Sequence, residues 1–290
     1  MSLFERLLQA VRSWRRRSGR VRAVRNPVNM MEQLDHRQML TVAFTGNVLT
    51  DFPATQNPGV VILPDNANVQ HPVIPANLQA VVGVSGFDIS GLRVSYSPDD
   101  GGTLSLGIQQ PVNPFDPAGR PVIAGDADNN GNSGTVNPVI SDPTTVPPSG
   151  LYPDFQDLAD FGGTEYMGVY LDLLGTGTAQ LAAGFSPAVP IGQAPKTFQV
   201  ATATQPGPNA PPIFLTALPQ NQGNIYTQND PNHANMELSI VNFDSLYQSI
   251  TGAALTPNSV INIGAFAGSS QDNPISEAFF PAQPVLIGAA

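Results

Sequence analysis

Residues 92–108 read LRVSYSPDDGGTLSLGI, and this stretch decides the fold class. Apolar residues occupy alternate positions on both sides of the turn-forming segment Pro98–Gly102. Because successive side chains of a strand point to opposite faces, a period of two around such a turn predicts an antiparallel hairpin. The buried face of this hairpin would consist of Leu92, Val94, Tyr96, Leu104, Leu106 and Ile108.

Similar short runs, separated by turn-forming segments, follow along the rest of the chain. We expect strands at residues 39–44, 60–63, 78–84, 165–174, 179–185, 198–202, 213–215, 236–241, 260–266 and 279–287. One helical segment is expected at residues 244–250, with Asp244 as its N-cap and Gly252 as its end. The pattern predicts an all-β fold, an antiparallel β-sandwich of jelly-roll or immunoglobulin-like type, with long loops and one short helix.

The composition agrees with a fold that is rich in turns. The 290 residues include 27 Gly and 29 Pro, which are dispersed between the apolar runs. Only 12% of the residues are charged, about half the usual share, so Ser, Thr, Asn and Gln must cover most of the surface. The chain has no Cys, which excludes a disulfide framework, a thiolate metal site and a cysteine nucleophile.

Charge divides the chain into two parts. Residues 1–37 hold nine of the 12 Lys and Arg and three of the 22 acidic residues. The remainder holds three basic and 19 acidic side chains, a formal charge of −16. We therefore expect a basic leader, residues 1–38, and one β-sandwich domain, residues 39–290, with a long loop insertion at about 109–163. An acidic body argues against nucleic acid as a partner.

The leader has the pattern of a basic amphipathic helix over residues 1–25. A sorting arm, a membrane-surface helix and a nucleic-acid-binding arm all fit this pattern. No apolar core of the signal-peptide kind follows its arginines. No apolar run is long enough for a transmembrane helix either, so we expect no membrane-spanning segment.

One loop points to specific chemistry. Residues 125–134 read GDADNNGNSG and place oxygen-bearing side chains at alternate positions, with Gly131 following the third of them. Calcium takes six to eight oxygen ligands, and a chain bent around it presents every second residue. The loop therefore predicts a calcium site, calcium being the one cofactor that we expect. Its first ligands would be Asp126, Asp128, Asn130 and Asn132.

The predicted ion site is incomplete within this loop. An EF-hand would have a bidentate Glu at the twelfth position, where this chain has Asn137. The missing carboxylate must come from the acidic segment downstream. The candidates are Asp154, Asp157, Asp160 and Glu165. The alternative is a solvated turn that binds no ion.

Two resemblances bear on location. The segment Leu34-Asp35-His36-Arg37-Gln38-Met39-Leu40 resembles the Leu-Glu-x-Arg-x-Leu-Leu sorting motif of planctomycete exported and surface proteins, although Asp35 replaces Glu and Met39 replaces Leu. The body resembles a poorly characterised group of exported bacterial β-sandwich domains with D-x-D-x-N-G calcium loops. This second resemblance rests on residues 87–108, 125–134 and 264–270 and on the strand that holds Glu165. Together they imply an exported, extracellular or cell-surface protein.

Two functions remain open. The first is a non-catalytic, calcium-stabilised exterior protein that acts in adhesion, surface structure or ligand display. The second is a carbohydrate-active module that binds or hydrolyses polysaccharide. The low aromatic content of 7%, and a single tryptophan, Trp14, in the leader, favour the first. The three histidines fall in no recognised catalytic pattern, so we expect no catalytic residues. The partner would be a surface ligand, either polysaccharide or protein.

We predict that the leader is dispensable for folding, because the change in charge places it outside the domain. A chain of residues 41–290 should unfold cooperatively, with a Tm within about 4 °C of that of the full chain, the shift that corresponds to roughly 1 kcal/mol. Differential scanning calorimetry of both chains measures this difference. An insoluble shortened chain, or one without a cooperative transition, would contradict the prediction.

Overall fold

The computed structural model describes residues 42–53, 59–74, 76, 79–127, 129, 161, 165–187, 197–207, 209–227, 232–269 and 277–290. The chain divides into residues 1–39 and 40–290, and all described residues belong to the second unit. The expected leader therefore lies outside the described residues, as does most of the expected insertion.

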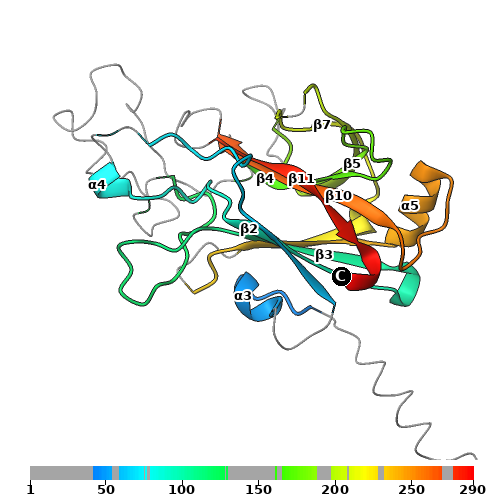
Figure 1. Cartoon of the computed structure of the whole chain (residues 1–290), viewed down its shortest axis with the longest axis horizontal. Coiled ribbons are helices and arrows are strands. Elements are labelled where there is room, and N and C mark those ends of the chain that lie inside the picture. Colours follow the sequence, from blue (N-terminus) through cyan, green and yellow to red (C-terminus); the bar gives the residue numbers. More distant parts are fainter. Residues whose placement is uncertain are drawn as a thin grey trace, which may run out of the picture. The chain divides into compact units, whose positions relative to one another are not determined.

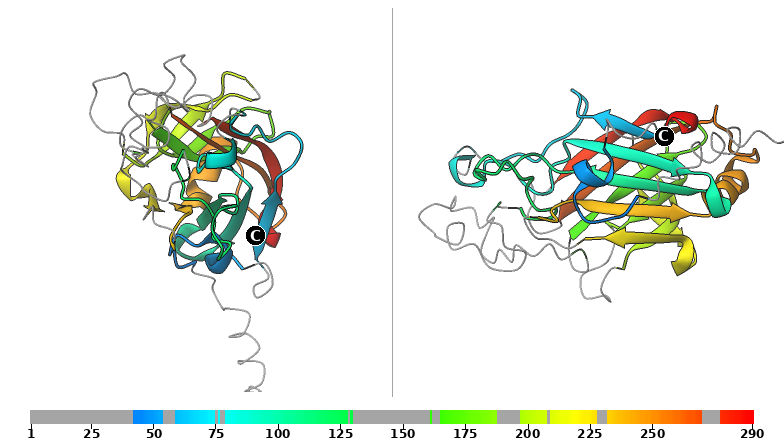
Figure 2. Two further views of the ribbon diagram at one scale, coloured as in Figure 1. Left: turned by 90° about the vertical axis from the view of Figure 1, so that its left-hand side faces the viewer. Right: turned by 90° about the horizontal axis from the view of Figure 1, so that it is seen from below.

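The described strands form two antiparallel sheets (Figures 1 and 2). Sheet A has five strands, in the spatial order β1 (Val60–Pro64), β2 (Gly91–Ser97), β3 (Thr103–Gln109), β9 (Met236–Val241) and β8 (Gly223–Tyr226). Sheet B has six strands, in the order β11 (Ala278–Leu286), β10 (Val260–Ser269), β4 (Glu165–Asp172), β5 (Leu181–Gly184), β6 (Gln199–Thr204) and β7 (Ile213–Ala217). The prediction of an all-β antiparallel sandwich is confirmed.

The predicted hairpin at residues 92–108 forms as β2 and β3, and the expected residues of the two strands lie opposite one another. Leu92 pairs with Ile108, Val94 with Leu106, and Tyr96 with Leu104. A short 3-10 turn, η1 (Asp99–Gly101), connects the two strands, and Asp100 adopts a left-handed conformation there, with φ of 51°. The residues expected on the buried face are completely buried except Tyr96, which is half-buried. Ser95 and Ser105 on the other face are buried as well, which the alternation does not predict.

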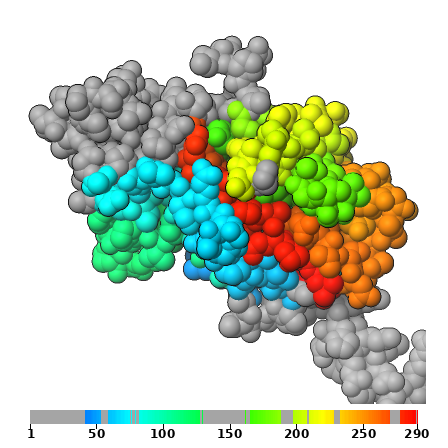
Figure 3. Space-filling view, turned by 45° about the horizontal axis from the view of Figure 1, so that its top comes forward, coloured from blue at the N-terminus to red at the C-terminus, as the bar shows by residue number. Residues whose placement is uncertain are grey.

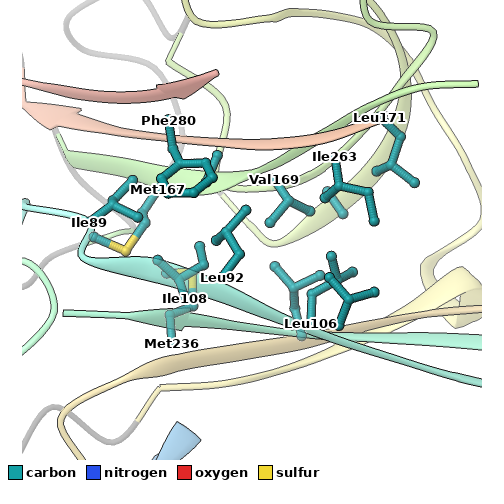
Figure 4. Packing of buried hydrophobic residues seen from close by; sticks show 14 of the residues in the cluster. Ile89, Leu92, Leu106, Ile108, Met167, Val169, Leu171, Met236, Ile263 and Phe280 are labelled. Atoms are coloured by element: carbon teal, nitrogen blue, oxygen red, sulfur yellow. The ribbon is translucent and has the colours of Figure 1, made fainter. Parts of the chain in front are cut away.

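The core fills the space between the two sheets (Figure 4). Leu92, Leu106 and Met236 extend from sheet A toward Val169 and Ile263 of sheet B. All five side chains are completely buried. Burial of a large aliphatic side chain contributes about 1.5–3 kcal/mol, so these inner faces hold the two sheets together.

The chain crosses between the sheets three times. Strands β1 to β3 lie in sheet A, β4 to β7 in sheet B, β8 and β9 again in sheet A, and β10 and β11 in sheet B. Consequently β3 pairs with β9, and β4 pairs with β10, across long separations in sequence. At one edge, Gln70 forms a bridge with Phe279 of β11, with N–H to O distances of 2.8 and 3.0 Å. This bridge fixes the segment after β1 beside sheet B.

The outer face of sheet A is covered by a short helix, α3 (Val48–Asp51). Val48 and the next residue after the helix, Phe52, are both completely buried. They pack over Gly107 of β3, where a Cβ atom would lie 2.6 Å from Cγ2 of Val48. The absence of a side chain at Gly107 thus allows α3 to approach the sheet.

The positions of helices α5 and α4 differ from those expected from the sequence. Helix α5 (Phe243–Thr251) begins after Asn242 instead of Asp244, and it ends, as predicted, at Gly252, whose φ is 75°. The expected strand at residues 78–84 is wrong: the structure has a four-residue helix there, α4 (Gln79–Val82). Helices α4 and α5 lie at opposite ends of the sandwich (Figure 1).

We predict that Gly107→Ala destabilises the protein by about 1–3 kcal/mol, because the added methyl group must displace Val48 or Phe52 from a fully packed position. Urea denaturation measures the change in the free energy of unfolding. The matched control is Gly207→Ala, since a Cβ atom at Gly207 meets no atom within 4 Å. Equal stability of the two variants would show that α3 does not require the glycine.

Candidate functional site

The predicted calcium loop begins at a fixed point of the structure. Asp126 is completely buried. Its carbonyl oxygen accepts a hydrogen bond from the N–H of Gly86 at 2.7 Å, and the N–H of Gly125 donates to the carbonyl oxygen of Gly86 at 3.1 Å. A side chain at Gly86 would lie 1.8 Å from the carbonyl oxygen of Ile123. The two segments therefore pack backbone against backbone.

Asn129 extends this anchored region. Its φ of 57° lies in the left-handed region, which asparagine tolerates better than most residues. Its side-chain amide donates to the carbonyl oxygen of Val82 at 3.2 Å and to Oδ1 of Asn113 at 2.9 Å. Asn129, the third residue after Asp126, is therefore held by hydrogen bonds to two separate segments.

Of the downstream candidates, the structure describes Glu165. It is the first residue of β4, lies opposite Ser269 of β10, and is only 2% exposed. Buried carboxylates are costly unless hydrogen bonds, a cation or protonation compensates them. The described part of the chain contains no group of three His, Cys, Asp or Glu arranged to hold a metal. The other predicted ligands lie outside the described residues: Asp128, Asn130, Asn132, Asp154, Asp157 and Asp160.

A network of polar side chains lies under α3, and no pattern in the sequence indicates it. The N–H of Gly46 donates to Oε2 of Glu237 at 2.7 Å, and the N–H of Val48 donates to Oδ1 of Asn235 at 3.2 Å. At the other end of the helix, Arg93 donates through Nη1 to the carbonyl oxygen of Phe52 at 2.6 Å. Acceptors at the N-terminus and a cation at the C-terminus satisfy the free backbone groups of a helix. The network therefore ties α3 to sheet A.

Glu237 is the unusual member of this network. Burial raises its pKa to about 8, and the neighbouring Asp51 carboxylate adds to the rise, while the N–H groups of Gly46 and Thr45 oppose it. Its Oε1 atom has no hydrogen-bond partner among the described residues. Glu237 is completely buried, and its Oε2 atom holds the segment before α3 through the N–H of Gly46.

A hollow of about 700 Å³ lies on the outer face of sheet B. It forms where the segment after β1, the strands β4, β10 and β11, and the loop after β6 meet; Figure 3 shows the cyan, red and yellow segments side by side on this face. Four neutral amides line it: Asn68, Gln205, Asn209 and Asn262. The sequence gives no signal for this site, because its residues come from five separate segments.

Asp172 organises one wall of the hollow. Its carboxylate accepts hydrogen bonds from the N–H of Gly177 at 2.8 Å, from the N–H of Thr176 at 3.0 Å, and from the Asn262 amide at 3.2 Å. Burial alone would raise the pKa of Asp172, but these donors outweigh it and lower the pKa. The carboxylate therefore stays ionised and holds the turn between β4 and β5 in one conformation.

Tyr170 forms the floor of the hollow. Its ring stacks on Phe279 with centroids 5.4 Å apart, and its hydroxyl donates to the carbonyl oxygen of Phe280 and accepts from the N–H of Ala282. The ring covers the partner residue Gly264 so closely that a Cβ atom there would lie 2.4 Å from Cζ of Tyr170. Tyr170 is thus fixed in place by packing and by hydrogen bonds.

Comparisons with known proteins returned no match to a family model, to a curated protein or to a solved structure. Among the helices that the structure describes, none is both long enough and apolar enough to cross a membrane.

We predict that Glu237→Gln flattens the pH dependence of stability. Between the ordinary pKa of 4.5 and the folded-state value of about 8, the folded protein keeps a proton that the unfolded chain has released. Stability must therefore fall as the pH rises through this window. Glutamine cannot ionise, so the variant should be more stable than the natural chain by about 1–3 kcal/mol near pH 9 and similar to it near pH 4.

Urea denaturation at several pH values measures this effect. Asp100→Asn serves as the control, since Asp100 is exposed and asparagine tolerates its left-handed conformation. Parallel pH profiles for the natural chain and Glu237→Gln would mean that Glu237 is ionised in the folded protein.

Proposed function

We propose that this chain is a non-catalytic exported or cell-surface protein, a calcium-stabilised β-sandwich that acts in adhesion, surface structure or ligand display. The observation that carries the calcium part is the burial of two acids. Asp126 is 0% exposed and Glu165 is 2% exposed, and they lie on either side of the Asn- and Asp-rich segment 128–160. A buried carboxylate is costly unless hydrogen bonds, a cation or protonation compensates it, and a bound ion would supply such a cation.

Calcium is the cation that this arrangement suits best. Alternating Asp and Asn side chains supply the hard oxygen ligands that calcium prefers, and a buried carboxylate contributes both charge and rigidity. The anchored backbone around Gly86 and Gly125 would hold the first ligand in place before the ion binds. An ion would also restrain a connection that is unusually long for a compact domain, in a chain that has no disulfide to do so.

The exterior location rests on the sequence. The leader segment Leu34–Leu40 resembles the sorting motif of planctomycete surface proteins, and the body resembles exported bacterial domains. Low charge content and the lack of cysteine are compatible with this assignment. The partner in this proposal is a surface ligand, polysaccharide or protein, because the acidic body would repel nucleic acid.

We predict that excess calcium raises the Tm of the full chain by about 5–10 °C relative to chelator. A free calcium concentration near 100 times the Kd stabilises a protein by about 2.7 kcal/mol, which corresponds to this shift for a domain of about 250 residues. Asp126→Asn combined with Asp128→Asn should remove most of the shift. Thermal melts by circular dichroism measure it, with magnesium as the comparison ion.

The control for this experiment is Asp100→Asn, which removes one carboxylate charge at an exposed turn far from the loop in sequence. It should retain the full calcium shift. Equal Tm values in calcium and in chelator for the natural chain would contradict the calcium proposal. Residues 125–134 would then be a turn that binds no ion.

A further inference from the structure

The hollow on the outer face of sheet B has the chemistry of a ligand site. Its volume of about 700 Å³ falls in the range of small-molecule sites, about 300–1,000 Å³. Its lining combines neutral amides with small apolar surfaces, and none of the described lining residues is Lys, Arg or His. The ligand that fits must be recognised by hydrogen bonds and not by a positive charge.

The charge of the lining excludes anions. Asp172 is ionised and lies in the wall. The two arginines of the described part of the chain are used elsewhere: Arg93 holds the end of α3, and Arg120 forms an ion pair with Asp116 at 2.5 Å. A phosphate, sulfate or uronic acid would meet a carboxylate with no compensating cation among the described lining residues, which costs binding free energy.

The amides are arranged to bind hydroxyl groups. An amide side chain has both donors and an acceptor, as a sugar hydroxyl does. Asn262 uses one N–H on Asp172, which fixes its orientation and leaves its carbonyl oxygen to accept. Gln205 uses one N–H on the carbonyl oxygen of Ala210 at 2.9 Å, and its side chain is also hydrogen-bonded to Tyr170, which together fix its orientation. Asn68 and Asn209 are exposed and stand at the rim.

Apart from the Tyr170 floor and the Asp172 wall, the remaining described lining is small and apolar. Ala67, Ala282 and Pro281 contribute methyl and ring carbons, while Gly175 and Gly177 leave room above the turn that Asp172 holds. A pyranose ring has a hydroxyl-bearing rim and faces made of C–H groups, so its two kinds of surface match the two kinds of lining. Because the wall is ordered before binding, little entropy is lost on ordering it.

We propose that this hollow binds a neutral saccharide. The site extends the ligand-display role given above by naming the class of ligand, and it uses no residue of the predicted calcium loop. A saccharide ligand would also fit an exterior protein whose surface is poor in charge.

The test uses the full chain on a glycan array of neutral oligosaccharides (glucans, mannans, galactans and xylans) beside uronic and sulfated ones, followed by titration calorimetry of the best neutral binder. We expect selective binding to a neutral class. Asn68→Ala combined with Asn209→Ala should weaken it about tenfold or more, the loss expected for two hydrogen bonds. Ala67→Trp, which fills the hollow from an exposed position, should abolish it.

The matched control is Asn258→Ala, because Asn258 is an exposed turn asparagine that does not line the hollow. It should bind like the natural chain. All binding assays are run in excess calcium, so weaker saccharide binding cannot result from loss of calcium. The thermal melts described above test the calcium site separately. Absence of binding to every neutral glycan, preference for acidic ones, or full binding by Ala67→Trp would overturn the proposal.

Discussion

The whole structure depends on the mutual burial of the inner faces of the two sheets. The inner face of each sheet carries large aliphatic side chains, such as Leu106 in sheet A and Val169 in sheet B. These side chains are buried because the other sheet covers them. Features attached to the outer faces can therefore vary without loss of this core. Sheet A uses its outer face to hold a helix, while sheet B uses its own to form a polar hollow.

Much of the fold could be predicted from the sequence, because a strand with one buried face alternates apolar and polar residues. The hairpin at residues 92–108 shows this most clearly, since its alternating apolar residues predict which side chains share a face, and these residues pair across β2 and β3. Local patterns failed where tertiary packing decides. The four-residue helices α3 and α4 carry no period long enough to recognise, and β8 (Gly223–Tyr226) has too few apolar residues to suggest a strand.

The candidate sites show a similar division. A loop whose ligands are close in sequence can be proposed from spacing, as at Asp126, and the structure adds that this carboxylate is buried. Glu237 alternates with apolar neighbours and would be assigned to solvent, but α3 covers it. The lining of the hollow could not be predicted from the sequence, because strand pairing, and not proximity along the chain, brings Asp172 beside Asn262.

The contact between Tyr170 and Gly264 has a consequence for how this protein can evolve. Any side chain at position 264 would occupy the space of the tyrosine ring, and a small residue at position 170 would leave a flexible glycine exposed within β10. Neither position can change alone without loss of packing. In homologous chains positions 170 and 264 should therefore covary, with glycine at position 264 wherever position 170 is aromatic. An aromatic residue paired with glycine at these two strand positions could identify related sheets among sequences of low identity.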